Sequence, residues 1–150
     1  MKDFASGCAG RKDLVYDVIV AGGGAAGVGA ALAASRRSRV LLVETESTVG
    51  GDLLTGMPIY GAWNSLGEQC VGGVLNDLVA ECRQQPDGFI GPVCDWRTVY
   101  GLCLSPAALH LAILRLLHAC GVHVMLKSTL TRVGAKDGHV VELEVASQDG

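Results

Sequence analysis

Apolar runs alternate with glycine-rich and polar stretches along the first third of the chain. The run at residues 15–20 is rich in β-branched residues and predicts a buried strand, and the run at 40–43 predicts a second strand that ends at Glu44. Between them, the alanine-rich residues from 25 to about 35 predict a helix. A strand, a helix and a strand in this order are typical of a parallel α/β unit.

The most regular helical pattern follows Ser105. Ser105 is a candidate N-cap, Pro106 suits the first helical position, and Gly121 suits the end of the helix. Apolar residues recur at helical spacing, so we expect one buried face. That face comprises Leu109, Ala112, Ile113, Leu116, Leu117 and Cys120.

The middle of the chain has a weaker pattern. Residues 45–67 are glycine-rich and aperiodic, which indicates a functional or a disordered loop. Residues 68–83 predict a helix that a Gly-Gly pair weakens. Because residues 84–96 contain two prolines, we expect a loop there.

The last part of the chain predicts strands and turns. Residues 122–126 predict a third parallel strand, and residues 129–135 and 140–146 predict two strands joined by the turn dipeptide Asp137-Gly138. A second turn dipeptide at residues 149–150 has no strand after it. We therefore expect a β-meander that is cut short.

Composition narrows the class of function. The net charge is −3 with no basic run, and aromatic residues make up only 5 %, which disfavours a nucleic-acid surface or an anionic membrane surface as the partner. Residues 18–35 are uncharged like a membrane span, but the five glycines among them fit a ligand-binding turn better.

The six cysteines form no Cys-x-x-Cys pair, so neither a zinc site nor a redox dithiol is expected. With no secretory signal in the sequence, we expect a cytoplasmic location.

One glycine cluster matches the pattern G-x-G-x-x-G. It comprises Gly22, Gly23, Gly24, Ala25, Ala26 and Gly27. Gly22 permits a tight turn out of the first strand, Gly24 lets a pyrophosphate approach the backbone, and Gly27 lets the helix pack closely on the sheet. We expect the bare main-chain amides of residues 22–27 and the positive end of the helix dipole to face the phosphates.

Glu44 lies 20 residues beyond Gly24, at the end of the second predicted strand. A carboxylate at this position can accept hydrogen bonds from a ribose diol and would repel a 2′-phosphate, so NADP is disfavoured. The alternative interpretation is a glycine turn in an ordinary α/β protein, with a glutamate there by chance. The order of strand, glycine turn, helix, strand and acid favours the dinucleotide.

A double glycine, Gly50-Gly51, follows inside the long loop, where backbone could lie along a bound ligand. Together with residues 18–27 and 41–44, it resembles the opening of FAD-dependent oxidoreductases of the glutathione-reductase-like superfamily, and within it a large bacterial FAD-dependent oxidoreductase group. The resemblance covers roughly residues 15–146.

The resemblance implies a fold and a domain organisation. The fold is α/β: a three-layer Rossmann-like FAD/NAD(P)-binding domain with a parallel sheet plus a β-meander. This domain would occupy residues 14–150, after a flexible tail at residues 1–13. Because members usually run several hundred residues and return to the cofactor with a later strand, the domain would be incomplete at its C-terminus.

The resemblance also implies FAD as the cofactor. Residues lining the pyrophosphate would be Gly22, Gly24, Ala26 and Gly27. Glu44 would hold the adenosine ribose, with Thr45 beside the adenine. The segment Gly50, Gly51 and Asp52 would approach the flavin side, and the backbone of Leu130 would pair with the adenine edge.

The expected function is redox catalysis, in which a small-molecule substrate passes a hydride or electrons to the flavin. Two alternatives stay open: an NAD-binding dehydrogenase domain, and a truncated, non-catalytic remnant without cofactor. No catalytic residue is assigned.

Several residues are of types that can take part in binding or catalysis, but a structural role is the better interpretation for them. We expect Cys70, Cys82, Cys103 and Cys120 to be buried, His110 and His118 to be solvated, and Trp63 and Trp96 to cover the core from loops or to stack on a ligand.

Overall fold

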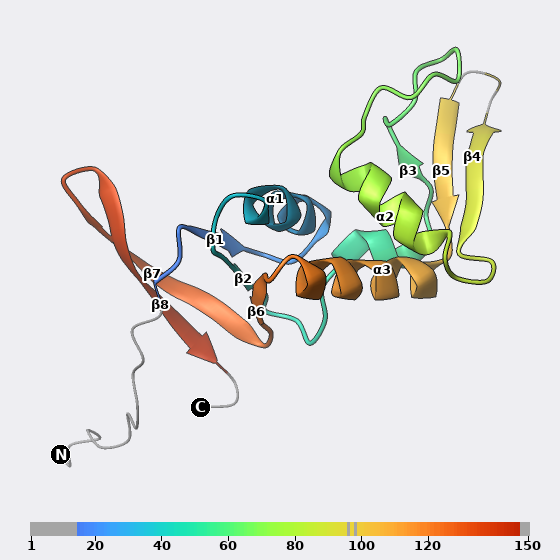
Figure 1. Ribbon diagram of the computed structural model, residues 1–150. Helices are drawn as coiled ribbons and strands as arrows, with labels where there is room; N and C mark the ends of the chain where they lie inside the picture. Colours follow the sequence, from blue (N-terminus) through green and yellow to red (C-terminus); the bar gives the residue numbers. More distant parts are fainter. Residues whose placement is uncertain (1–14, 96, 98, 148–150) are drawn as a thin grey trace.

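The computed structural model describes residues 15–95, 97 and 99–147 (Figure 1). The tail expected at residues 1–13, the aromatic residue Trp96 and the turn dipeptide at 149–150 lie outside the described residues. Among the described helices, none combines the length and the apolarity that crossing a membrane requires.

A parallel sheet forms the centre of the fold. Its strands β1 (Val18–Ala21), β2 (Val40–Val43) and β6 (His123–Met125) lie in the order β1-β2-β6, with every neighbouring pair parallel. All four residues of β2 are buried, as expected for a continuous apolar run in the middle of a parallel sheet. The strand predicted at residues 15–20 begins only at Val18 and continues to Ala21.

Two helices pack on one face of this sheet. Helix α1 (Ala25–Ser35) connects β1 to β2, and α3 (Pro106–Ala119) precedes β6. Val40 and Leu42 point to the same face of β2, and they share one core cluster with side chains of both helices. The α/β class with a parallel sheet is therefore confirmed.

Helix α3 follows its predicted pattern closely. Ser105 occupies the N-cap position, although its side chain makes no capping hydrogen bond, and Pro106 is the first helical residue. The predicted apolar face is buried or partly buried except for Cys120. The expectation of a buried Cys120 is wrong because this residue is the C-cap, where the chain leaves the packed face and turns through Gly121 (φ +67°).

A second sheet contains the main departure from the prediction. Strands β3 (Ile59–Tyr60), β5 (Val99–Leu104) and β4 (Phe89–Asp95) form an antiparallel sheet in the order β3-β5-β4. The loop predicted at residues 84–96 is therefore wrong for Phe89–Asp95, whereas residues 84–88 form the predicted loop. Pro92 is tolerated because β4 is an edge strand that pairs only with β5, and an irregularity in register between Phe89 and Gly91 bends the strand before it.

Shorter elements connect the two sheets. The long glycine-rich loop contains the 3-10 helix η1 (Gly51–Thr55) as well as β3. Helix α2 (Val74–Cys82) begins later than the predicted residue 68, because Gly73 adopts a positive φ of +65° that a helix does not allow. Cys82, on its last turn, is completely buried, as predicted.

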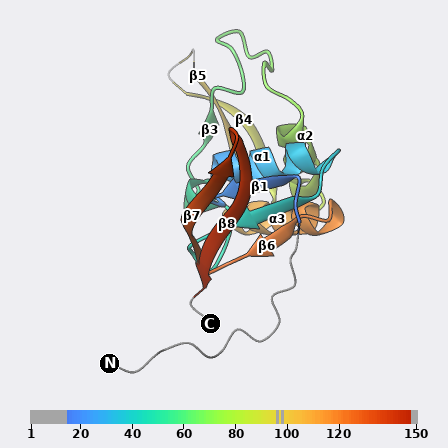
Figure 2. The same cartoon turned by 90° about the vertical axis from the view of Figure 1, so that its left-hand side faces the viewer.

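The strands β7 (Ser128–Lys136) and β8 (His139–Ser147) form an antiparallel hairpin that projects from the body of the molecule (Figures 1 and 2). Its turn is the predicted Asp137-Gly138 dipeptide, and both residues have positive φ, +52° and +77°. The hairpin supplies the antiparallel part of the predicted fold.

Two adjacent residues of α3 provide a test of where the core lies. Ile113 is completely buried, whereas Leu114 is 44 % exposed. We expect Ile113→Ala to lower the free energy of unfolding by about 2–5 kcal/mol, because it removes buried methyl groups and leaves a cavity. Leu114→Ala, the matched control, should cost about 0.5 kcal/mol or less. Urea unfolding followed by circular dichroism measures both, and equal losses would contradict the packing described.

Candidate dinucleotide-binding site

The glycine turn after β1 is packed tightly at two positions. Gly22 has a positive φ of +99°, and its N–H donates to the Val43 carbonyl at 2.7 Å, so the turn is fastened to the end of β2. A Cβ added at Gly27 would overlap the carbonyl oxygen of Gly22. Only glycine at position 27 therefore allows the first turn of α1 to approach the strand end this closely.

Glu44 lies against this turn. Its side chain is buried, and the Gly23 N–H donates to Oε2 across 21 residues of sequence. The other carboxylate oxygen, Oε1, accepts from the Glu46 N–H at 2.8 Å and from the Thr45 hydroxyl at 2.9 Å. The expected proximity of the acid and the glycine loop is therefore confirmed, with Thr45 bound to the same carboxylate.

Hydrogen bonding keeps this carboxylate ionised. Burial by itself raises the pKa of Glu44, but donors from Glu46, Gly23 and Thr45 outweigh it, and the net pKa lies below the ordinary value. An ionised carboxylate has about four acceptor positions. At least three are used within the protein, and the Thr45 N–H also interacts with the carboxylate and lowers its pKa.

The open donors of the site belong to the helix and not to the turn. The N–H groups of Gly22 and Gly23 bind Val43 and Glu44, so the expectation that all amides of residues 22–27 face a ligand is wrong for these two. In the first turn of α1, by contrast, the N–H groups of Ala25, Ala26 and Gly27 have no intrahelical acceptor. This part of α1 has no side-chain cap and no acidic residue, which suits an anion.

The space in front of this helix end fits a phosphate group. Gly24 is the N-cap, with ordinary extended backbone (φ −71°, ψ −169°), so its conformation does not require glycine. A Cβ built there would meet no protein atom within 4 Å. The missing side chain therefore leaves open space beside free N–H donors, which is the cradle that a pyrophosphate needs.

The double-glycine loop closes over the same turn. The Gly50 N–H donates to the Gly23 carbonyl at 2.7 Å, and a Cβ on Gly51 would lie 3.2 Å from the Gly24 Cα. Gly50 has a φ of +117°, a conformation that L side chains rarely adopt. The structure thus brings Gly50 and Gly51 against the first glycine cluster, with the exposed Asp52 next in η1.

A histidine holds this loop from the other side. Nε2 of His110 in α3 lies 2.7 Å from the Thr48 hydroxyl, 62 residues away in sequence. The expectation of a solvated His110 is wrong, because this contact partly buries it; His118, two turns further, is exposed as predicted. The sequence alone had no signal for this pair, since Thr48 lies in an aperiodic loop.

The position of Leu130 follows from the start of β7. The Ser128 N–H donates to the Glu44 carbonyl at 2.9 Å, and the Lys127 N–H donates to the Glu46 carbonyl at 3.0 Å. These bonds fix the beginning of β7 beside the end of β2. Half-buried Leu130 lies two residues further along β7.

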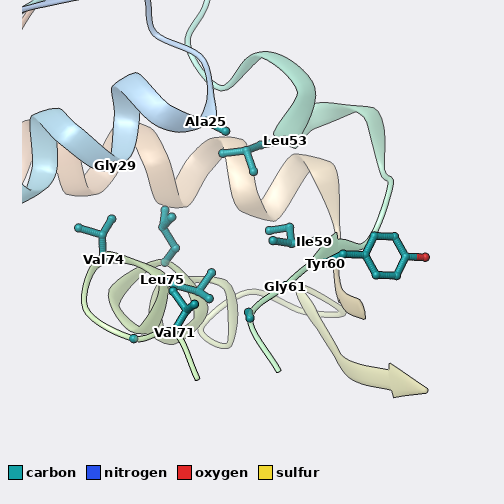
Figure 3. Close-up of a pocket in the computed structure, with 12 residues that line it drawn as sticks. Ala25, Gly29, Leu53, Ile59, Tyr60, Gly61, Val71, Val74 and Leu75 are labelled. Atoms are coloured by element: carbon teal, nitrogen blue, oxygen red, sulfur yellow. The ribbon is translucent and has the colours of Figure 1, made fainter. Parts of the chain in front are cut away.

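A cavity adjoins the glycine turn and was not predicted. It has a volume of about 310 Å³ and lies between α1, η1, β3 and α2 (Figure 3). Residues from these elements that line it include Ala25, Gly29, Leu53, Ile59, Val74 and Leu75. Sequence reasoning missed it because four separate segments contribute to it.

Three further expectations can be compared with the structure. Cys70 is exposed rather than buried, since it lies in the irregular segment before α2. Cys103, also expected in the core, is only partly buried on β5. Trp63 is partly buried against the core, as expected for a loop aromatic that covers apolar residues.

One protein family matches almost the whole chain. The sequence model of the family described as "FAD dependent oxidoreductase" matches residues 17–150. A comparison with curated proteins gives no match.

Solved structures share the fold. The 3-ketosteroid-Δ4-(5α)-dehydrogenase from Rhodococcus jostii matches with a TM-score of 0.63 and 18 % identity, over 89 % of this chain and 42 % of its own. THI4 from Thermovibrio ammonificans matches with a TM-score of 0.58 and 18 % identity, over 88 % of this chain and 48 % of its own. This chain therefore spans less than half the length of either protein.

The hydrogen bonds of Glu44 predict a dependence of stability on pH. The pKa of Glu44 is lower in the folded than in the unfolded protein, so the folded state binds fewer protons in acid. The stability that Glu44 contributes is present above the unfolded pKa, about 4.3, and is lost as the pH falls through the lower folded pKa. We expect Glu44→Gln to be less stable than the wild type at neutral pH, and the difference to shrink below about pH 4.

Urea unfolding at a series of pH values measures this difference. Glu46→Gln, which removes the neighbouring exposed carboxylate, is the matched control and should cost about 0.5 kcal/mol or less at neutral pH. A constant difference between wild type and Glu44→Gln at all pH values would show that the carboxylate is not held as described.

Proposed function

Because this chain belongs to the family of FAD dependent oxidoreductases, we propose that its glycine turn, Glu44 and double-glycine loop hold FAD in a redox enzyme. The chain is the FAD-binding portion of such a protein, and FAD is its cofactor. The single observation that carries the assignment of residues is the open space at Gly24, beside the free N–H groups at the start of α1.

Each part of the site has a distinct role in this proposal. The N–H groups of Ala25, Ala26 and Gly27 bind the pyrophosphate, and the absent side chain of Gly24 gives it access. Gly22 and Gly23 shape the turn through their bonds to Val43 and Glu44 instead of donating to the ligand.

We propose that the adenosine end of FAD lies beyond Glu44. The Glu44 carboxylate accepts a hydrogen bond from a ribose hydroxyl, and Thr45 and the backbone of Leu130 flank the adenine. The start of β7, held beside β2, supports this direction for the adenine. Gly50, Gly51 and Asp52 then follow the cofactor towards the flavin, which is supported by the contact of Gly50 with Gly23.

The proposed activity of the whole protein is oxidation or reduction of a small organic substrate. When bound, FAD supplies the electron-transfer chemistry, and the protein orients it and excludes competing reactions. The residues described here bind and orient; none of them is assigned a proton transfer. We propose residues 14–150 as one cofactor-binding domain, and a cytoplasmic location, where thiols stay reduced.

Binding of FAD is tested by thermal unfolding and titration. A ligand that binds only the folded state raises the melting temperature in proportion to the logarithm of its concentration. We expect FAD to raise the melting temperature of the protein and NADH to leave it unchanged. An increase with NADH alone would favour an NAD-binding domain, and no increase with either would favour a remnant without cofactor.

Gly24→Val separates ligand binding from folding. In the free protein a Cβ at this position meets no protein atom within 4 Å and the backbone conformation is allowed, so we expect a loss of stability of about 1 kcal/mol, from the poorer helix cap. Because the side chain occupies the approach of the pyrophosphate, affinity for FAD should fall by about tenfold or more, which corresponds to about 1.4 kcal/mol.

Ala30→Val, on an exposed position of α1, is the matched control and should retain FAD affinity. Titration monitored by the quenching of flavin fluorescence measures both variants. Unchanged affinity in Gly24→Val would place the pyrophosphate elsewhere.

A further inference from the structure

The cavity beside the glycine turn has an almost purely apolar lining. Leu53 of η1 faces it from one side, Val74 and Leu75 of α2 from another, and Ile59 of β3 closes a third (Figure 3). Tyr60 lies at the margin, but its ring points away from these side chains (Figure 3), and its hydroxyl donates to Asp95 at 2.9 Å. No charged side chain lines the cavity among the described residues.

A glycine in α1 provides a second, independent observation. Gly29 is in the interior of the helix, where glycine costs about 1 kcal/mol relative to alanine. The usual reason for such a glycine is close approach of another element, as at Gly27. At Gly29, however, an added Cβ would meet no atom within 4 Å, and Gly29 is one of the residues that line the cavity.

The cavity also adjoins the proposed cofactor site. Ala25 lines the cavity, and its N–H group is one of the free donors at the start of α1. A molecule in the cavity would therefore lie within one helical turn of the phosphate-binding donors. Its volume of about 310 Å³ falls in the range of small-molecule sites, which are mostly apolar clefts.

We propose that this cavity is a binding site for an uncharged, apolar organic ligand, such as an aliphatic or aromatic ring. The lining has nothing to compensate a buried charge, and burying an unpaired charge is far more costly than burying an apolar group. Identifying this ligand with the substrate rests on the proposed function. The binding site itself rests only on the cavity and Gly29.

Indole is a suitable probe because it is neutral, mostly apolar and small enough for the cavity. We would titrate the ¹⁵N-labelled protein with indole, with and without FAD, and follow backbone amide signals by NMR. The expected result is saturable shifts at Gly29, Gly61 and Gly72, which line the cavity.

Gly29→Leu should block the site without damaging the helix, since leucine is a better helix former than glycine. We expect indole affinity to fall by about tenfold or more, with FAD affinity unchanged. Ala30→Leu adds the same side chain to an exposed neighbouring position of α1 and should bind indole like the wild type.

The outcomes separate the two proposals. The proposed binding site would be overturned by either of two results: indole-induced shifts of amide signals spread evenly over the surface, or unchanged indole affinity in Gly29→Leu. If indole binds at the cavity but FAD does not bind the protein, the site stands, and both the proposed function and the identification of the ligand as a substrate fail.

Discussion

The bond between the Gly23 N–H and the Glu44 carboxylate is the interaction on which the site depends. It joins the turn after β1 to the residue that follows β2, and the same carboxylate binds the next two residues of the chain. The turn is also fastened by the Gly22 bond to Val43 and by the Gly50 bond to the Gly23 carbonyl. The buried acid and these two backbone bonds together fix the geometry of three segments around one open space.

Backbone and side chains have different roles in this site. The groups left free to bind are main-chain N–H donors at the end of α1, which need no side chain and tolerate no bulk in front of them. Side chains support these donors indirectly: Glu44 and the Thr48–His110 pair hold the surrounding loops in place. A binding surface made of backbone is rigid because helix and sheet hydrogen bonds already determine its position.

The apolar cavity shows a different use of glycine. At Gly27 the absence of a side chain allows two protein segments to touch, whereas at Gly29, two residues later, it leaves a space unfilled. The two positions look identical in the sequence. A pyrophosphate site and an apolar cavity can therefore share one helix, with polar donors at its end and an apolar wall along its side.

The sequence by itself determined the local part of this protein: α1 and β2 at their predicted residues, α3 from Ser105 to Gly121, and the Asp137-Gly138 hairpin turn. These features depend on periodicity, caps and turn conformations, which neighbouring residues decide. Only the tertiary structure decided that Pro92 lies in a strand, that His110 binds Thr48, that Cys70 and Cys120 are exposed, and which amides of the glycine turn are free. Each of these depends on a partner far away in the sequence. The local pattern of residues contains no information on which distant segment packs against a given residue.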